Sequence, residues 1–132
     1  MLRLVINLDR SPERLQRITT ALKTFDLEFS RVRAVDGKLL TNEEVCQWTL
    51  SKPQRHLFFR DLTLTEIGCC LSHRKCWQKL VDSSDEWALV LEDDCIFSER
   101  VQSFIASEKW IPRASEILCP WDNRSPPIGC IQ

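Results

Sequence analysis

The chain has 132 residues, of which 43% are hydrophobic and 28% charged, so it can bury the core of one domain and no more. Three Gly and six Pro exclude collagen-like and linker-like polymers, and a net charge of -1 gives no bulk reason to bind nucleic acid. Residues 1–60 hold 11 Lys and Arg against 7 Asp and Glu, whereas residues 61–132 hold 7 against 12. This division suits an anionic ligand bridged by a cation, and equally two solvated faces.

The first third of the chain predicts a strand, a helix and a second strand. An aliphatic run over residues 2–8 is typical of a strand buried on both faces. Ser11 as N-cap and Pro12 at the first helical position predict a helix. Its apolar stripe comprises Leu15, Ile18, Leu22 and Phe25. Residues 29–35 predict the second strand, which the turn pair at 36–37 closes.

The later elements continue this alternation. The capping-box pattern from Thr63 to Glu66 predicts the start of a long helix. In order, we expect a short helix at 41–50 capped by Thr41 or Asn42 and ended by Pro53, the long helix to about Val81, a strand at 87–91, a helix at about 98–106 and a strand at 116–119. This order predicts an α/β domain with a mainly parallel sheet.

The seven cysteines stand at 46, 69, 70, 76, 95, 119 and 130 and follow no secretory leader or membrane-spanning run. We therefore expect reduced thiols and a cytoplasmic protein, with peripheral contact at the inner face of the cytoplasmic membrane as an alternative. A zinc site is the sharper alternative for part of this set, because Cys69, His73 and Cys76 share one helical face. No second ligand pair follows at a spacing typical of structural zinc.

Polar clusters follow two of the predicted strands. The first strand runs into residues 7–10, and the third runs into Glu92, Asp93 and Asp94. Ligands of open α/β sheets bind outside the carboxyl ends of the strands. Three successive carboxylates repel one another, and a hard divalent cation with oxygen ligands is the usual compensation. The alternative is a solvated acidic turn that caps the next helix.

Residues 5–15, V-I-N-L-D-R-S-P-E-R-L, resemble the opening of the family 25 glycosyltransferases, the lipopolysaccharide and lipooligosaccharide galactosyltransferase group. Three further blocks resemble the same family, in family order and with similar spacing: residues 33–37, 64–73 and 88–94. Each block alone is weak, since an acid pair after a strand is common. Together they indicate a similarity over about residues 3–100.

The resemblance implies a GT-A-type, mainly parallel α/β domain. Such a domain transfers a sugar, usually galactose, from a UDP-sugar to a saccharide acceptor of lipopolysaccharide or lipooligosaccharide. It also implies a D-x-D-like motif whose Mn²⁺ or Mg²⁺ stabilises the departing diphosphate. By this match Asp94 is the expected metal ligand and Asp93 the fallback ligand. Glu92 is expected to hold the ribose or a metal-bound water.

The other blocks imply further nucleotide-sugar contacts. Asn7, Arg10 and Arg14 match the first block and are expected near the base, ribose and phosphates, where an arginine can pair with phosphate oxygens bidentately. An exposed helix face is the alternative for Arg14. Asp36 is expected to border the nucleoside, with a plain turn as the alternative.

Two residues of the long helix complete the expected site. Glu66 and His73 are seven positions apart, so they share one helix face and are expected to line the donor or acceptor side. For His73 the alternative is a helix-face histidine with its hydrogen bonds satisfied. Glu66 is the one candidate for the base that deprotonates the acceptor hydroxyl.

Family members are much longer than this chain. We therefore expect residues 1–132 to form a single family 25 domain that is truncated at its C-terminus, without the acceptor-binding half. Two hypotheses follow: a metal-assisted galactosyltransferase, or a non-catalytic remnant that binds a nucleotide sugar. An incomplete sheet also predicts self-association through its open edges.

Overall fold

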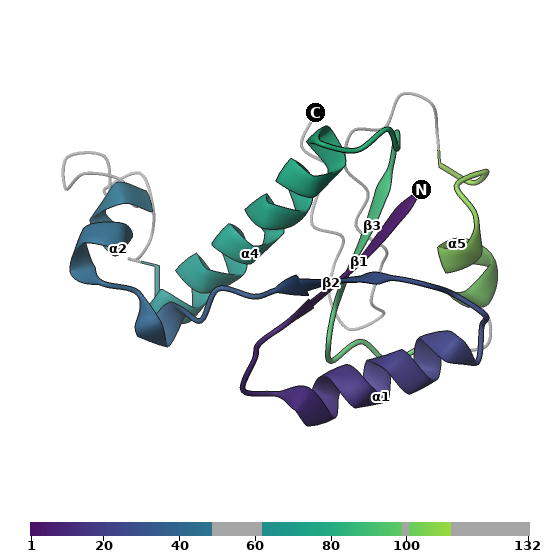
Figure 1. Ribbon diagram of the computed structural model, residues 1–132, viewed down its shortest axis with the longest axis horizontal. Coiled ribbons are helices and arrows are strands. Elements are labelled where there is room, and N and C mark those ends of the chain that lie inside the picture. The colour runs from purple at the N-terminus through teal and green to yellow at the C-terminus, as the bar shows by residue number, and fades with distance from the viewer. Residues whose placement is uncertain (49–61, 99–100, 112–132) are drawn as a thin grey trace.

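The computed structural model describes residues 1–48, 62–98 and 101–111, which form a parallel sheet with helices on both faces (Figure 1). The strands are β1 Leu2–Asn7, β2 Ser30–Arg33 and β3 Ala88–Glu92. The helices are α1 Pro12–Lys23, α2 Asn42–Trp48, α4 Leu64–Val81 and α5 Gln102–Ala106, with a 3₁₀ turn η1 at Gly37–Leu39. The predicted α/β class is confirmed. The predicted strand at 116–119 and the expected helix stop at Pro53 lie outside the described residues.

The sheet order is β2-β1-β3, with both pairings parallel. Ile6 of β1 pairs with Val32 of β2 and with Glu92 of β3, so the three carboxyl ends meet at one edge. The chain leaves β1 for β2 on one side and later returns to β3 on the other. In open α/β sheets such a change of direction forms the crevice where ligands bind.

Two apolar clusters cover the two faces of the sheet. The cluster that contains Cys76 of α4 also holds Leu4, Ile6 and Val32. The cluster on the side of α1 and α5 comprises Val5, Ile18, Leu22, Leu91 and Ile105. Successive residues of a strand point to opposite faces, so β1 supplies both clusters. This is the double burial that its aliphatic run predicts.

Helix α4 touches the loop after β2 backbone to backbone. A Cβ placed on Gly68 would lie 2.7 Å from the carbonyl oxygen of Val35, and one on Gly37 would lie 1.8 Å from the carbonyl oxygen of Leu64. The Ser72 hydroxyl accepts the Val35 N–H at 2.8 Å and donates to the Gly68 carbonyl at 2.7 Å. Two of the four sequence blocks therefore meet here, because glycine alone allows so close an approach.

The capping box of α4 is present as predicted: Thr63 accepts the Glu66 N–H, and the Glu66 carboxylate accepts the Thr63 N–H at 2.8 Å. A second capping box starts α2, since Thr41 accepts the Glu44 N–H at 3.2 Å. At α1 the prediction is only half right. The helix begins at Pro12, but Ser11 makes no side-chain cap.

Two elements are shorter than the sequence predicts. β2 ends at Arg33 rather than residue 35, because the Val35 N–H bonds the Ser72 hydroxyl instead of a neighbouring strand. α5 begins at Gln102 rather than at about residue 98. In the described part of the chain, no helix is long and apolar enough to cross a bilayer.

Candidate functional site

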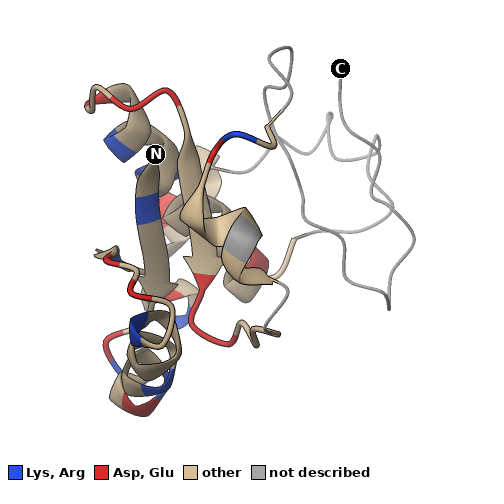
Figure 2. Cartoon of the chain, turned by 90° about the vertical axis from the view of Figure 1, so that its right-hand side faces the viewer, with Lys and Arg blue, Asp and Glu red and all other residues tan. Residues whose placement is uncertain are grey.

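A pocket of about 200 Å³ lies at the carboxyl edge of the sheet. Its walls come from the end of β1, the loop after β2, helix α4 and the end of β3, where acidic segments follow the strand (Figure 2). The predicted site residues that line it are Asn7, Arg10, Arg14, Asp36, His73, Glu92 and Asp93. Asp94 and Glu66 are not among the lining residues.

Asn7 joins four segments at the base of this pocket. The residue is 1% exposed, and its side-chain amide nitrogen donates to Asp93 Oδ2 at 2.6 Å and to the Ser11 carbonyl at 2.9 Å. Its Oδ1 accepts from Arg31 Nε at 3.0 Å. The amide therefore ties the end of β1 to β2, to the start of α1 and to the turn after β3. The hydrogen bonds of Asn7 therefore hold neighbouring residues in position, and they do not leave its amide free for a ligand.

Arg14 neutralises two members of the acidic triplet. Its Nη1 lies 3.0 Å from Asp93 Oδ1, and its Nη2 lies 3.1 Å from Asp94 Oδ2. Asp93 is buried, and both of its carboxylate oxygens are engaged, one by Arg14 and the other by Asn7. The Asp94 side chain is 52% exposed. Of the two aspartates, Asp94 is thus the one that a cation from solvent can reach.

Glu92 connects the end of β3 to α4. Its Oε1 lies 3.3 Å from His73 Nε2 and 3.8 Å from Cys69 Sγ. The hydrogen bond from His73 holds the pKa of Glu92 below its usual range, against the opposing effect of burial. Burial, and then the nearby Glu92 carboxylate, raise the pKa of the Cys69 thiol. A carboxylate, an imidazole and a thiol thus face one another at the pocket wall.

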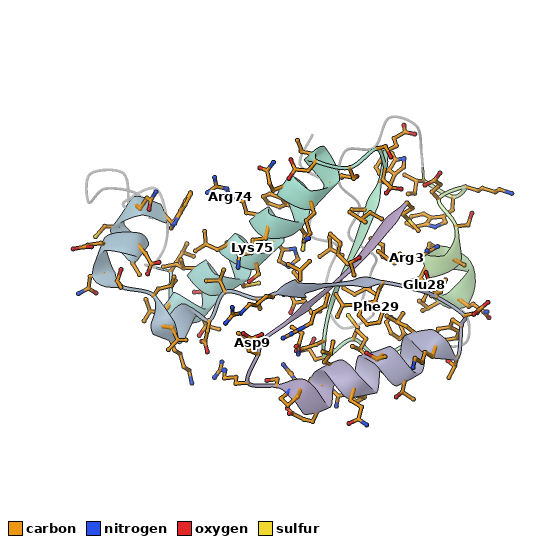
Figure 3. The ribbon with its side chains drawn as sticks, in the orientation of Figure 1. Arg3, Asp9, Glu28, Phe29, Arg74 and Lys75 are labelled. Carbon is orange, nitrogen blue, oxygen red and sulfur yellow. The ribbon has the colours of Figure 1, made fainter. Side chains whose placement is uncertain are left out.

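Further arginines gather after β1 and on β2. Arg10 Nε lies 3.0 Å from Asp36 Oδ2, so these two predicted residues form an ion pair. Asp9, labelled in Figure 3 at the end of β1, pairs with Arg31 at 2.7 Å and also with Arg33. Desolvation acts to raise the pKa of Asp9, but the hydrogen bonds and charges of both arginines outweigh it and lower the pKa.

The sequence did not predict Arg31, Arg33 and Ser72 as parts of this region, and it singled out Cys69 only as a possible zinc ligand. The two arginines alternate near the end of a predicted strand, which was the available signal for them. Ser72 and Cys69 lie within the third sequence block, but no spacing rule separates their roles from those of their neighbours. Their positions depend on how α4 packs on the loop after β2.

The zinc ligand set Cys69, His73 and Cys76 is wrong. Cys76 is fully buried in the apolar cluster with Leu4, and burial raises the pKa of its thiol to about 11. Seven residues of helix rise about 10 Å, so residues that share a face need not share an ion. The five described cysteines are all unpaired.

Glu66 lies at the start of α4, where its carboxylate accepts hydrogen bonds from the Thr63 N–H at 2.8 Å and the Thr63 hydroxyl at 2.9 Å. These contacts belong to the capping box. Its role as a catalytic base stays a prediction.

The sheet is parallel, has helices on both faces and carries charged residues at its carboxyl edge. These features define an α/β domain that is consistent with part of a GT-A-type glycosyltransferase fold. The sequence model of the family described as glycosyltransferase family 25 (LPS biosynthesis protein) matches residues 1–120. The chain therefore belongs to this family.

Three relatives match most of this chain and are themselves much longer. Procollagen galactosyltransferase 2 of Mus musculus is 35% identical over 99 residues, which cover 73% of this chain and 16% of the relative. A glycosyltransferase 25 family member of Drosophila pseudoobscura pseudoobscura is 35% identical over 70% of this chain and 15% of its own length. A probable inactive glycosyltransferase 25 family member 3 of Bos taurus is 32% identical over 122 residues, 89% of this chain and 20% of its own. The chain thus spans a fifth or less of the length of these relatives.

Proposed function

We propose that this chain is the donor-binding part of a galactosyltransferase and binds UDP-galactose in the pocket at the carboxyl edge of the sheet. The observation that carries the proposal is the convergence of seven predicted residues, drawn from all four sequence blocks, on one pocket. The lining offers two arginines for a diphosphate and acidic groups for ribose hydroxyls or a cation.

The acidic residues after β3 suit Mn²⁺ or Mg²⁺ in the mode these ions usually adopt, with one or two carboxylates plus substrate phosphates. Asp93 has both oxygens engaged, whereas Glu92 and Asp94 each keep one oxygen that no described residue bonds. We therefore assign the cation to Asp94 and Glu92, with Asp93 as a positioning residue. The bound cation would stabilise the negative charge on the departing diphosphate.

Arg10 and Arg14 would hold the donor phosphates. Arg10 is about half exposed, and its partner Asp36 sits beside it at the pocket rim. Arg14 already forms ion pairs with Asp93 and Asp94. If its guanidinium moved from these carboxylates to a donor phosphate, donor binding would be coupled to the acidic turn after β3. Asn7 would act through these residues, by fixing Asp93 and the start of α1.

Two acceptor classes remain for this proposal. The sequence resemblance implies a saccharide of lipopolysaccharide or lipooligosaccharide, whereas the names of the animal relatives state procollagen as their acceptor. We retain the saccharide as the proposed acceptor and make procollagen an arm of the test.

A second candidate function is nucleotide-sugar binding without transfer. The relative that this chain covers most fully among those above is named as probably inactive, and the one base candidate, Glu66, is occupied by a capping box. Transfer requires an acceptor hydroxyl and a base within reach of its proton, in addition to the donor.

Calorimetric titration of UDP-galactose with and without Mn²⁺ tests the donor site. We expect Mn²⁺-dependent binding, and at least a tenfold weaker affinity for Asp94→Ala. Asp82→Ala, an exposed aspartate at the end of α4, is the matched control and should bind as the parent does. Unchanged binding by a folded Asp94→Ala variant contradicts the metal assignment, and no UDP binding by the parent chain contradicts the proposed function.

A radiolabelled-donor assay separates the two functions. With lipooligosaccharide or procollagen as acceptor, the 132-residue chain should transfer galactose slowly or not at all and release it slowly to water. Turnover in the usual enzyme range of roughly 1–10³ per second would instead place an acceptor site and a base within this chain.

A further inference from the structure

The described residues contain one group of three potential metal ligands within 4.8 Å of one another: Cys69, His73 and Glu92. Cys69 and His73 are four positions apart on α4, so their side chains lie on one face, one turn from each other. Glu92 is the last residue of β3 and approaches from the sheet. The group therefore spans a helix and a strand that lie side by side at the pocket.

The two distances to the Glu92 carboxylate are close to those of a tetrahedral site. With zinc bonds of about 2.3 Å to sulfur and about 2.0–2.1 Å to nitrogen and oxygen, the tetrahedral edges are about 3.4 Å for N···O and about 3.6 Å for S···O. The structure has 3.3 Å between His73 Nε2 and Glu92 Oε1, and 3.8 Å between Cys69 Sγ and the same oxygen. All three ligand atoms lie within 4.8 Å of one another, so side-chain rotations would bring them around one ion.

The donor types select the metal. A thiolate and an imidazole favour zinc and similar borderline transition metals, whereas magnesium and calcium prefer oxygen alone. All three side chains are partly or well exposed, so a cation can enter from solvent. Three protein ligands with a fourth position open are typical of sites that keep a water or another ligand.

The site is held in place before a metal arrives. Gly68, next to Cys69, touches the backbone of Gly37 and fixes the first turns of α4, while pairing with β1 fixes Glu92 through its strand. We propose that Cys69 Sγ, His73 Nε2 and Glu92 Oε1 bind a zinc-class divalent cation, with a fourth coordination position open to the pocket. This site shares Glu92 with the oxygen site proposed for Mn²⁺ but adds a thiolate and an imidazole as donors, and it does not depend on the proposed function.

Titration of the full chain with Co²⁺ under reducing conditions tests the proposal. We expect binding of one equivalent with a thiolate-to-cobalt charge-transfer band in the near ultraviolet and the intense visible bands of four-coordinate cobalt. Cys69→Ser should abolish the charge-transfer band, and His73→Gln and Glu92→Gln should each weaken binding at least tenfold. Cys70→Ser is the matched control, since Cys70 is the next residue of α4, also exposed and outside the group.

A charge-transfer band that survives in Cys69→Ser, or that Cys70→Ser removes, would overturn the proposal. Circular dichroism establishes that each variant is folded. X-ray absorption on the zinc-loaded parent chain is a second measurement that requires no substitution. It should show one sulfur with nitrogen and oxygen ligands at tetrahedral distances, whereas a shell of oxygens only would also overturn the assignment.

Discussion

The two walls of the pocket use their polar atoms in opposite ways. On the strand-end wall, Asn7 and Asp93 are buried and their side chains are bonded to several partners at 2.6–3.0 Å. On the helix wall, Cys69 and His73 are at least partly exposed, and their contacts to Glu92 are longer, at 3.8 and 3.3 Å. The first wall is a structural scaffold, whereas the second leaves its donor atoms available to a ligand.

The difference teaches that proximity to a pocket does not assign a role. Removing one member of a buried, bonded network leaves partners without compensation and is costly. Exposed ion pairs contribute about 0–1 kcal/mol, so residues of the helix wall can be replaced with little loss of stability. Stability and ligand binding should therefore separate cleanly between the two walls.

Asn7→Ala should have the largest effect. It strips a hydrogen bond from buried Asp93 and another from Arg31, so we expect the free energy of unfolding to fall by about 3 kcal/mol or more. His73→Ala, on the helix wall, should cost less than about 1 kcal/mol. Urea denaturation of both variants measures the contrast, and equal losses would break the comparison.

Gly68→Ala tests what positions the helix wall. The added Cβ meets backbone atoms of Val35 and Gly37 at 2.7 Å, which cannot move away as a side chain would. Overpacking of this kind costs about 1–3 kcal/mol, of which the better helix propensity of alanine returns part. Cys70→Ala, exposed on the same helix, should leave the melting temperature nearly unchanged; a similar fall in both variants would contradict the backbone contact.

Glu66 distinguishes a capping role from a chemical one. Glu66→Ala should lower the free energy of unfolding by about 1 kcal/mol, because it removes half of the capping box. Glu66→Gln should keep the cap, since glutamine also serves at this position. If the glutamine variant is as stable as the parent but loses any transfer activity, Glu66 has a chemical role as well; if glutamine and alanine destabilise equally, the capping account is wrong.

Acid should reveal the hydrogen bond between His73 and Glu92, which joins the helix wall to the end of β3. The pKa of Glu92 is lowered in the folded chain, so its ionised form adds stability above the ordinary carboxyl value of 4.5. That contribution is lost as the pH falls from 4.5 through the folded-state pKa. The stability difference between parent and Glu92→Gln should therefore be a few tenths of a kcal/mol larger at about pH 6 than at about pH 3. A stability difference that is equal at both pH values would show that the contact between His73 and Glu92 adds no stability.

Local signals in the sequence predicted the elements well. The strand at Leu2–Asn7 and the capping box at Thr63 each depend on neighbours within a few residues, and both are present. The carboxyl-edge rule then predicted that residues after β1 and β3 would meet, as Asn7 and Asp93 do. These inferences need only periodicity, capping chemistry and the parallel sheet.

The sequence could not predict in the same way which pocket residues bond one another and which are left to bind a ligand. Asn7 and Arg14 were expected to face the nucleotide, yet their side chains bond Asp93. The pairing of Cys69 with Glu92 depends on the close packing of Gly68 against Gly37, a contact between segments 31 residues apart. Helical spacing showed that Cys76 shares a helix face with Cys69 and His73. It did not show how far Cys76 lies from them along the helix axis, or that Cys76 is buried.

The central position of β1 also has a consequence in time. The Asn7–Asp93 hydrogen bond joins residues 86 positions apart, and of the three described strands β1 is synthesised first and its partner β3 last. At about 5–20 residues per second, a ribosome needs on the order of 4–17 s to add the intervening chain. During that interval the most buried of the three described strands has one edge unpaired, and the pocket cannot exist. Ligand binding by nascent chains should therefore start abruptly, once the acidic turn has left the ribosome.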